Sequence, residues 1–184
     1  MSTPAGDHRA TAARFTELVR GTTDWEAPAP CAGWTARDVV RHLVEWLPGF
    51  LRSGAGVELP VVPSVDADPV AAWEAHAGAV QAVLNDPASA AVMFRNPHTG
   101  NLPLPAAIAT FYTSDVFLHT WDLARATGQD ERLDPQRCAA MLEGMLPMDA
   151  LLRSSGQYGP RVEVPEDADP QTKLLAFIGR DPLP

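Results

Sequence analysis

Asp115 and His119 are the two residues whose types and spacing first indicate chemistry. They stand four positions apart in the segment Asp115-Val-Phe-Leu-His119-Thr-Trp-Asp122. In an α-helix, residues i and i+4 are about 40° apart around the axis, so both side chains lie on one face. A carboxylate and an imidazole with this spacing can reach a single ion, as the paired ligands of helical metal sites do. The spacing therefore indicates part of a metal site.

His42, on an earlier predicted helix, is the best candidate for a third ligand. Two imidazoles and one carboxylate would form an N/N/O site that leaves coordination positions free for a substrate. The pattern also allows an interpretation without metal. Asp115 and His119 could be a hydrogen-bonded couple inside a bundle, and His42 could be a core histidine whose nitrogens have protein partners. The spacing alone leaves both interpretations open.

The helix that carries Asp115 and His119 is predicted to be buried, because it is apolar on nearly all sides. Its apolar residues are Phe111, Val116, Phe117, Leu118, Trp121 and Leu123. Buried ionisable groups need partners, and a metal ion would supply one because it favours carboxylate and neutral imidazole together. Asp122 could be a fourth ligand, but we expect it to orient an imidazole or to bond Trp34 or a helix terminus.

Asp122 and Arg125 are the candidates for a catalytic role beyond the metal ligands. Arg125 comes about one helical turn after Asp122. It could bind a substrate carboxylate, although an interhelical salt bridge is the simpler role. Cys31 could face the site as a soft ligand, and the simpler interpretation is a thiol buried by its own loop.

The remaining histidines give weaker signals. We expect His76 to be exposed or to lie between helices, and His8 lies near the N-terminus. His98, in a proline- and glycine-containing loop, could line a substrate pocket, but solvation is the simpler expectation. The sequence has no glycine-rich phosphate cradle and no nucleophile elbow, so phosphoryl transfer and serine hydrolysis lack support.

The first two predicted helices carry His42 and its neighbours. Apolar residues at helical spacing predict a helix over residues 7–20. The next helix opens at Thr35, because Thr35 and Asp38 have the spacing of a capping box. Pro48 and Gly49 should kink or fray its far end, since proline lacks the N–H that a helix interior needs.

The later part of the chain alternates helices with short breaks. Three predicted helices begin at Asp-Pro pairs, in which aspartate caps the helix and proline takes its first position. The predicted elements are a helix over 69–84, a hairpin or loop excursion over 91–104, a helix over 105–127 ended by Gly128, a helix over 135–152, an extended stretch over 161–165 and a helix over 170–179. Helices of these lengths favour an all-α four-helix bundle, with a short C-terminal extended segment and a terminal helix.

Composition narrows the class of protein. A length of 184 residues predicts one domain over residues 1–184. The net charge of −9 argues against nucleic acid and against an anionic membrane surface as partners. The N-terminus lacks the pattern of a signal peptide, and no apolar stretch approaches the ~20 residues that span a bilayer. Cys31 and Cys138 are expected to be reduced thiols, so we expect a cytoplasmic protein.

Two segments around these residues resemble the signatures of one protein family. The segment Pro30-Cys-Ala-Gly-Trp34-Thr35-Ala-Arg-Asp38-Val-Val-Arg-His42-Leu is similar to the first signature of the DinB-like superfamily, in its mycothiol-dependent maleylpyruvate isomerase branch. The segment Asp115-Val-Phe-Leu-His119-Thr-Trp-Asp122-Leu-Ala-Arg-Ala-Thr-Gly128 resembles the second signature. The ending, from Tyr158 to Pro182, resembles the tail of a single-domain subgroup of that branch, so the resemblance covers nearly the whole chain.

The resemblance implies a four-helix bundle with a divalent metal ion at one end. In that family a histidine of the second helix and a carboxylate-x-x-x-histidine pair of a later helix bind the ion, and the matching positions here are His42, Asp115 and His119. The isomerase has glutamate where this chain has Asp115, which is one methylene shorter. We expect zinc, with nickel, iron or manganese as alternatives. The resemblance also implies mycothiol as cosubstrate, whose sulfur would take the open metal position.

These observations lead to three functional hypotheses. The first is a metal-dependent thiol transferase or isomerase that acts on a small electrophile with mycothiol. The second is a non-catalytic metal-binding or stress-related bundle, in which the ion neutralises buried acids. The third is a metal-free protein of the same fold that binds or cyclises a small molecule. A homodimer is one assembly that the sequence allows, and neither nucleic acid nor membrane is expected as a partner.

Overall fold

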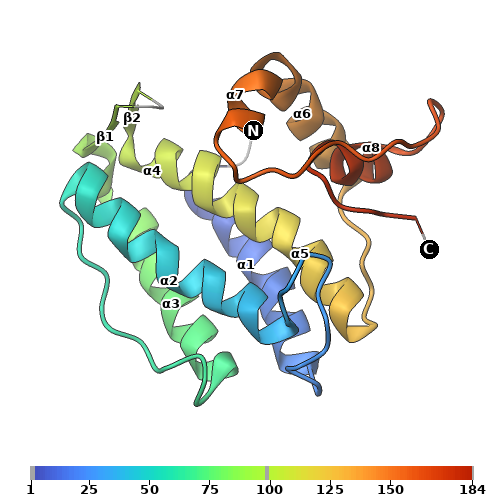
Figure 1. Cartoon of the computed structure of the whole chain (residues 1–184). Coiled ribbons are helices and arrows are strands. Elements are labelled where there is room, and N and C mark those ends of the chain that lie inside the picture. The colour runs from blue at the N-terminus through green and yellow to red at the C-terminus, as the bar shows by residue number, and fades with distance from the viewer. Residues whose placement is uncertain (1–2, 98–99, 184) are drawn as a thin grey trace.

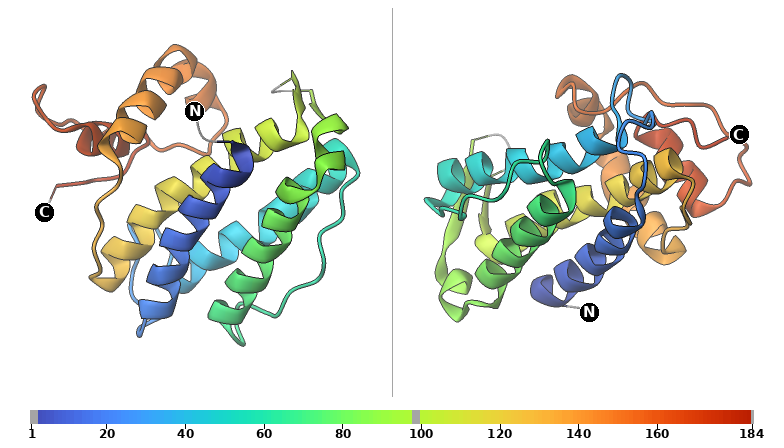
Figure 2. Two further views of the ribbon diagram at one scale, coloured as in Figure 1. Left: turned by 180° about the vertical axis from the view of Figure 1, so that it is seen from behind. Right: turned by 90° about the horizontal axis from the view of Figure 1, so that it is seen from below.

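Four helices form a bundle in the computed structural model, which describes residues 3–97 and 100–183 (Figure 1). They are α1 (Pro4–Gly21), α2 (Ala36–Ala55), α3 (Pro69–Asn85) and α5 (Ser114–Thr127). Helix α1 contacts α3 and α5, and α2 contacts the same two helices, so the four close into a ring. Figure 2 shows α1 and α3 side by side when the molecule is seen from behind. The predicted four-helix bundle is confirmed.

Side-chain caps begin the helices where the sequence predicts. The Asp68 carboxylate accepts a hydrogen bond from the Ala71 amide at 2.9 Å, at the start of α3. Thr35 and Asp38 form both bonds of the capping box at the start of α2. Because the cap fixes where α2 begins, it also fixes which face of α2 carries His42. The cap thus helps to position the candidate site.

Helix α2 does not fray at Pro48, which corrects the prediction for that helix. It continues through Pro48 to Ala55 and ends at Gly56, whose φ of 66° is the left-handed conformation of a helix stop. Leu47 and Leu51 on either side of the proline are fully buried. Tertiary packing therefore holds the helix together across a residue that is unfavourable in an isolated helix.

The segment predicted as one helix over 105–127 contains a change of helix type. It consists of α4 (Leu104–Ala107), the π-helical stretch η2 (Ile108–Thr113) and α5, which ends at Gly128. A π-helical stretch shifts the phase of the residues before it relative to those after it, and such stretches are frequent at functional sites. Here the π-helical stretch ends two positions before Asp115.

A small hairpin covers one end of the bundle, after the short helix η1 (Pro87–Ala91). Strand β1 (Met93–Asn96) pairs in antiparallel fashion with β2 (Gly100–Pro103), as the sequence predicts. Phe94 of β1 is fully buried and packs against Phe50 of α2, with ring centroids 4.4 Å apart. The prediction for His98 lies outside the described residues.

The C-terminal segment packs on the outer side of α5. The predicted helix over 135–152 is interrupted, because α6 (Pro135–Met145) is followed by the 3-10 turn η3 (Leu146–Met148), which contains Pro147, and then by α7 (Asp149–Ser154). Proline cannot donate the backbone bond that would continue α6. The last helix is α8 (Pro170–Phe177), close to the prediction.

Helix α5 is buried on two sides. Val116 and Leu123 belong to the core of the bundle, whereas Phe117, Leu118 and Trp121 join a second cluster with residues of α6 and α8. This arrangement explains why the sequence of α5 is apolar on nearly all sides. Among the described residues, no helix is long and apolar enough to cross a bilayer.

Candidate metal centre

His42, Asp115 and His119 come together between α2 and α5. His42 Nε2 is 3.0 Å from Asp115 Oδ2, and His119 Nε2 is 3.5 Å from Asp115 Oδ1. One donor atom from each residue lies within 4.8 Å of the other two. Donors around a tetrahedral ion with bonds of about 2.1 Å are about 3.4 Å apart. The chemistry and the separation of these three donors therefore fit a single divalent ion.

The group opens to solvent on the side of α2. The side chains of His42 and Asp115 are 32% and 26% exposed, whereas that of His119 is 6% exposed. A cavity of about 330 Å³ lies next to His42; its lining residues are Gly33, Trp34, Asp38, Arg41, His42 and Glu45. A cavity of this size suits a small ligand. His42 thus lies at the boundary between the donor group and the cavity.

Trp34 covers both imidazoles. Its ring stacks on His119, with centroids 5.7 Å apart and an interplanar angle of 17°, and its centroid is 5.1 Å from that of His42. An indole in this position limits the directions from which water reaches the donors. The hydrogen bond between Asp122 and Trp34 that the sequence allowed is absent from the described residues, and Asp122 contacts His119 instead.

Asp122 orients the imidazole of His119. Its Oδ2 is 2.9 Å from His119 Nδ1, and its side chain is only 1% exposed. An ionised carboxylate is an acceptor only, so Nδ1–H donates to Asp122, and Nε2 is the nitrogen directed towards Asp115. Of the roles that the sequence allows for Asp122, the contacts favour the orientation of an imidazole.

Trp46 holds the carboxylate of Asp115, a contact that the sequence interpretation missed. Its Nε1–H donates to Asp115 Oδ2 at 3.1 Å. Trp46 follows His42 by four residues on α2, so both side chains reach the same carboxylate from one helical face. That spacing was the available signal, but it is also the spacing of ordinary core residues.

Arg180, which was also missed, enters from the C-terminal segment. Its Nε is 3.0 Å from Asp122 Oδ1, and its Nη2 is 2.9 Å from Asp122 Oδ2. Nη2 also lies 3.1 Å from the Sγ of Cys31, and that Sγ is 3.5 Å from Asp122 Oδ2. A single arginine in an extended tail carries no local pattern that distinguishes it from a solvated one.

The two aspartates favour positive charge on the imidazole of His119. Burial disfavours a proton on His119, yet Asp115, Asp122 and Cys31 together raise the pKa of His119 to about 10. Burial opposes the ionisation of Asp122, but His119 and Arg180 lower the pKa of Asp122 to about 2. Burial likewise opposes the ionisation of Asp115, whose pKa is nevertheless lowered by His119 and His42. Both carboxylates are therefore charged, and the space between the donors attracts a proton or a metal cation.

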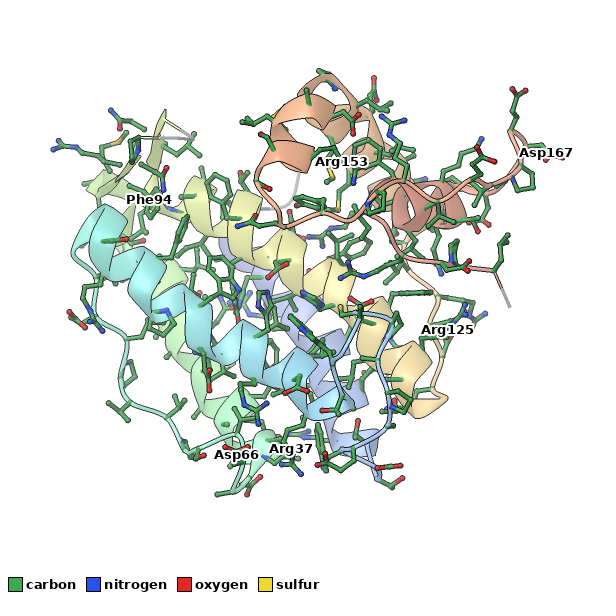
Figure 3. All side chains as sticks on the ribbon, viewed as in Figure 1. Arg37, Asp66, Phe94, Arg125, Arg153 and Asp167 are labelled. Atoms are coloured by element: carbon green, nitrogen blue, oxygen red, sulfur yellow. The ribbon has the colours of Figure 1, made fainter. Side chains whose placement is uncertain are left out.

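Arg125 does not join this group. It lies on the outer side of α5 (Figure 3), where its Nη2 donates to Glu131 Oε1 at 2.7 Å and to the Pro182 carbonyl at 3.1 Å. Its guanidinium also stacks over Trp121. The salt bridge expected for Arg125 is present, but its partner Glu131 lies in the loop after α5 and not on another helix.

Two other histidines are core residues. His8 and His76 are each 1% exposed and both contact the ring of Tyr112. His76 therefore lies between helices and is not exposed, which is one of the two positions expected for it. Burial, together with nearby His8, lowers the pKa of His76 to about 4. His76 is thus a neutral histidine at pH 7.

Comparisons with known proteins give matches over much of the chain. Residues 8–124 match the family described as mycothiol maleylpyruvate isomerase N-terminal domain. Two curated relatives are the uncharacterized proteins MT0763 and Rv0738 of Mycobacterium tuberculosis, from strains CDC 1551 / Oshkosh and ATCC 25618 / H37Rv. Each is 31% identical over 156 residues, which cover 83% of both chains. No solved structure matches the chain. The matched region contains all three donors of the candidate metal centre.

Proposed function

Because this chain belongs to the mycothiol maleylpyruvate isomerase N-terminal domain family, we propose that it is a divalent-metal-dependent thiol transferase or isomerase. The thiol is a low-molecular-weight one, mycothiol, and the substrate is a small electrophile. The observation that carries the proposal is the N/N/O group of His42, Asp115 and His119, whose donors lie within 4.8 Å of one another beside an open cavity.

These three residues would hold the ion, with zinc as the first expectation. A divalent ion at this position supplies a Lewis acid that lowers the pKa of a thiol and favours its thiolate at neutral pH. The protein's own contribution is to direct the donor atoms. Asp122 retains the proton on Nδ1 of His119, so that Nε2 is the nitrogen that would face the ion, and the ion would take the place of the second proton of this imidazole.

Trp34 and Trp46 prepare the site in different ways. Trp46 donates to Asp115 Oδ2 and so fixes the orientation of the carboxylate that both imidazoles contact. Trp34 covers the two imidazoles and lines the cavity, so it excludes water and leaves entry from the side of His42. A site that is closed on one side and open on the other suits a reaction with an external substrate better than a purely structural ion.

An assay of electrophile conversion tests the proposal, because a transferase consumes the thiol whereas an isomerase regenerates it. The metal-loaded protein would be mixed with mycothiol and a panel of electrophiles that contain either an activated double bond or a leaving group. We expect conversion of at least one electrophile that depends on both the metal and the thiol, and its loss in His42→Ala. The matched control is Glu17→Gln, a surface change on α1 whose side chain is 69% exposed. Equal conversion by the unmutated protein and His42→Ala would contradict the proposal.

A further inference from the structure

Cys31, His119 and Asp122 form a second group of donors, on the other nitrogen of the same imidazole. Their ligand atoms lie within 4.8 Å of one another, just as those of His42, Asp115 and His119 do. A thiolate, an imidazole and a carboxylate are all ligands that zinc accepts. His119 therefore lies between two donor groups, one N/N/O and the other S/N/O. Some feature of the structure must therefore favour binding of a divalent cation to the N/N/O group over the S/N/O group.

Arg180 already places a positive charge in the second group. Its guanidinium approaches both oxygens of Asp122 at 2.9 and 3.0 Å, and Nη2 is 3.1 Å from Cys31 Sγ. The side chain is 15% exposed, so solvent screens this charge only in part. Arginine stays protonated at all relevant pH values, so the positive charge of Arg180 is not removed by loss of a proton.

We propose that Arg180 is a built-in cation that keeps divalent ions out of the Cys31/His119/Asp122 group. Arg180 also pairs with Asp122, and Asp122 in turn contacts Nδ1 of His119 and holds the orientation of its ring. Only the Nε2 side then remains for an ion, which enters the group of His42, Asp115 and His119. The inference rests on the proposed function, since it assumes that this N/N/O group binds metal. Arg180 acts as a positioning residue that determines which side chains bind the ion and excludes the sulfur of Cys31 from them.

The C-terminal segment holds Arg180 in place by a close backbone contact. Gly179, which precedes it, has a φ of 88°, and a Cβ at this position would lie 2.8 Å from backbone atoms of Gly159. The amide of Arg180 donates to the carbonyl of Leu175 at 2.9 Å. The turn after α8 therefore requires glycine and directs the arginine towards α5.

Cobalt titration tests this inference, because a cysteine ligand gives cobalt(II) a sulfur-to-metal charge-transfer band in the near ultraviolet. For the unmutated protein we expect one bound cobalt and no such band. Arg180→Gln keeps a hydrogen-bond donor and loses the charge, so it should show the band, through a second cobalt or a displaced first one. The double variant Arg180→Gln/Cys31→Ala should lack the band.

Two matched variants separate charge from structure. Arg180→Lys keeps a cation and should show no band, and Arg125→Met, which removes an arginine paired outside the site, should behave like the unmutated protein. If Arg180→Gln does not fold, as judged by circular dichroism, Arg180→Met provides the same measurement.

The possible results distinguish the inference from the proposed function. A folded Arg180→Gln that binds one cobalt without the band overturns the inference. A charge-transfer band in the unmutated protein or in Arg180→Lys also overturns it. An unmutated protein that binds no cobalt at all overturns the proposed function instead.

Discussion

His42 of α2 and Asp115 of α5 meet at 3.0 Å, between Nε2 and Oδ2, although 73 positions separate them in the chain. The same carboxylate is 3.5 Å from His119 and accepts a hydrogen bond from Trp46. Aspartate is shorter than glutamate by one methylene, yet it reaches both imidazoles here because α2 and α5 pack directly against each other. Asp115 is therefore the central residue of the candidate metal centre.

Trp46→Phe should weaken metal binding without disturbing the fold. The change removes the N–H that fixes Asp115 and keeps an aromatic ring next to Phe50 and Tyr112. Loss of a residue that orients a metal ligand lowers metal affinity by about 10- to 100-fold. Competition with a chromophoric chelator measures this affinity.

Trp73→Phe is the control for that change. It removes another buried indole hydrogen bond, at 2.8 Å from Trp73 Nε1 to Thr16 Oγ1, away from the donor group. We expect lower stability and unchanged metal affinity. If Trp46→Phe bound metal as tightly as Trp73→Phe, the assigned role of Trp46 would be wrong.

His76 should make the protein less stable in mild acid. Its pKa is lowered from 6.5 to about 4 by burial and by nearby His8, so the unfolded chain accepts a proton that the folded protein resists. Stability is therefore complete above pH 6.5 and falls as the pH drops from 6.5 through about 4. By pH 4 the loss of unfolding free energy is on the order of 3 kcal/mol.

Urea unfolding at pH 7 and pH 5 tests this pH dependence. In His76→Leu the free energy of unfolding should change less between the two pH values than in the unmutated protein, by about 2 kcal/mol. His8, whose pKa is also lowered by burial, is present in both proteins, so the difference between them reports the loss of His76. An identical pH dependence in the two proteins would show that His76 is not held neutral.

Gly54→Ala should destabilise the protein, because the new methyl group would overlap the ring of Phe94. Phe94 is fully buried and packs against Phe50, so a movement of its ring would disturb this packing. Overpacking of this kind costs about 1–3 kcal/mol. Figure 3 shows Phe94 at the end of the bundle that the hairpin covers.

Gly78→Ala is the matched control on α3, since nothing lies within 4 Å of the position that its Cβ would take. Alanine favours a helix over glycine, so this change should stabilise the protein by about 0.5–1 kcal/mol. Urea unfolding of both variants gives the comparison. Similar effects of the two substitutions would mean that Phe94 does not pack against Gly54 as described.

Local chemistry made much of the fold predictable from the sequence. The Asp-Pro pairs at 68–69, 134–135 and 169–170 begin helices because aspartate caps and proline takes the first position. The apolar character of α5 correctly predicted its burial. The same local rules brought His42, Asp115 and His119 into consideration, since helical spacing and burial are properties of short segments.

Other features depend on contacts that short segments do not encode. The helix across Pro48 is held by packing of Leu47 and Leu51, which outweighs the local preference. The π-helical stretch η2 gives no periodic signal of its own. Trp46 and Arg180 reach Asp115 and Asp122 across 69 and 58 positions, so only the assembled fold reveals them.

Zinc analysis of the purified protein and its His42→Ala variant tests the central claim most directly. Both proteins would be prepared without chelator and measured by mass spectrometry of the metal, beside Glu45→Gln, whose exposed side chain lies one turn from His42. We expect about one divalent ion per chain in the unmutated protein and in Glu45→Gln, and a loss of this ion in His42→Ala. The absence of stoichiometric metal from the unmutated protein, or its full retention by His42→Ala, would contradict a metal centre at His42, Asp115 and His119.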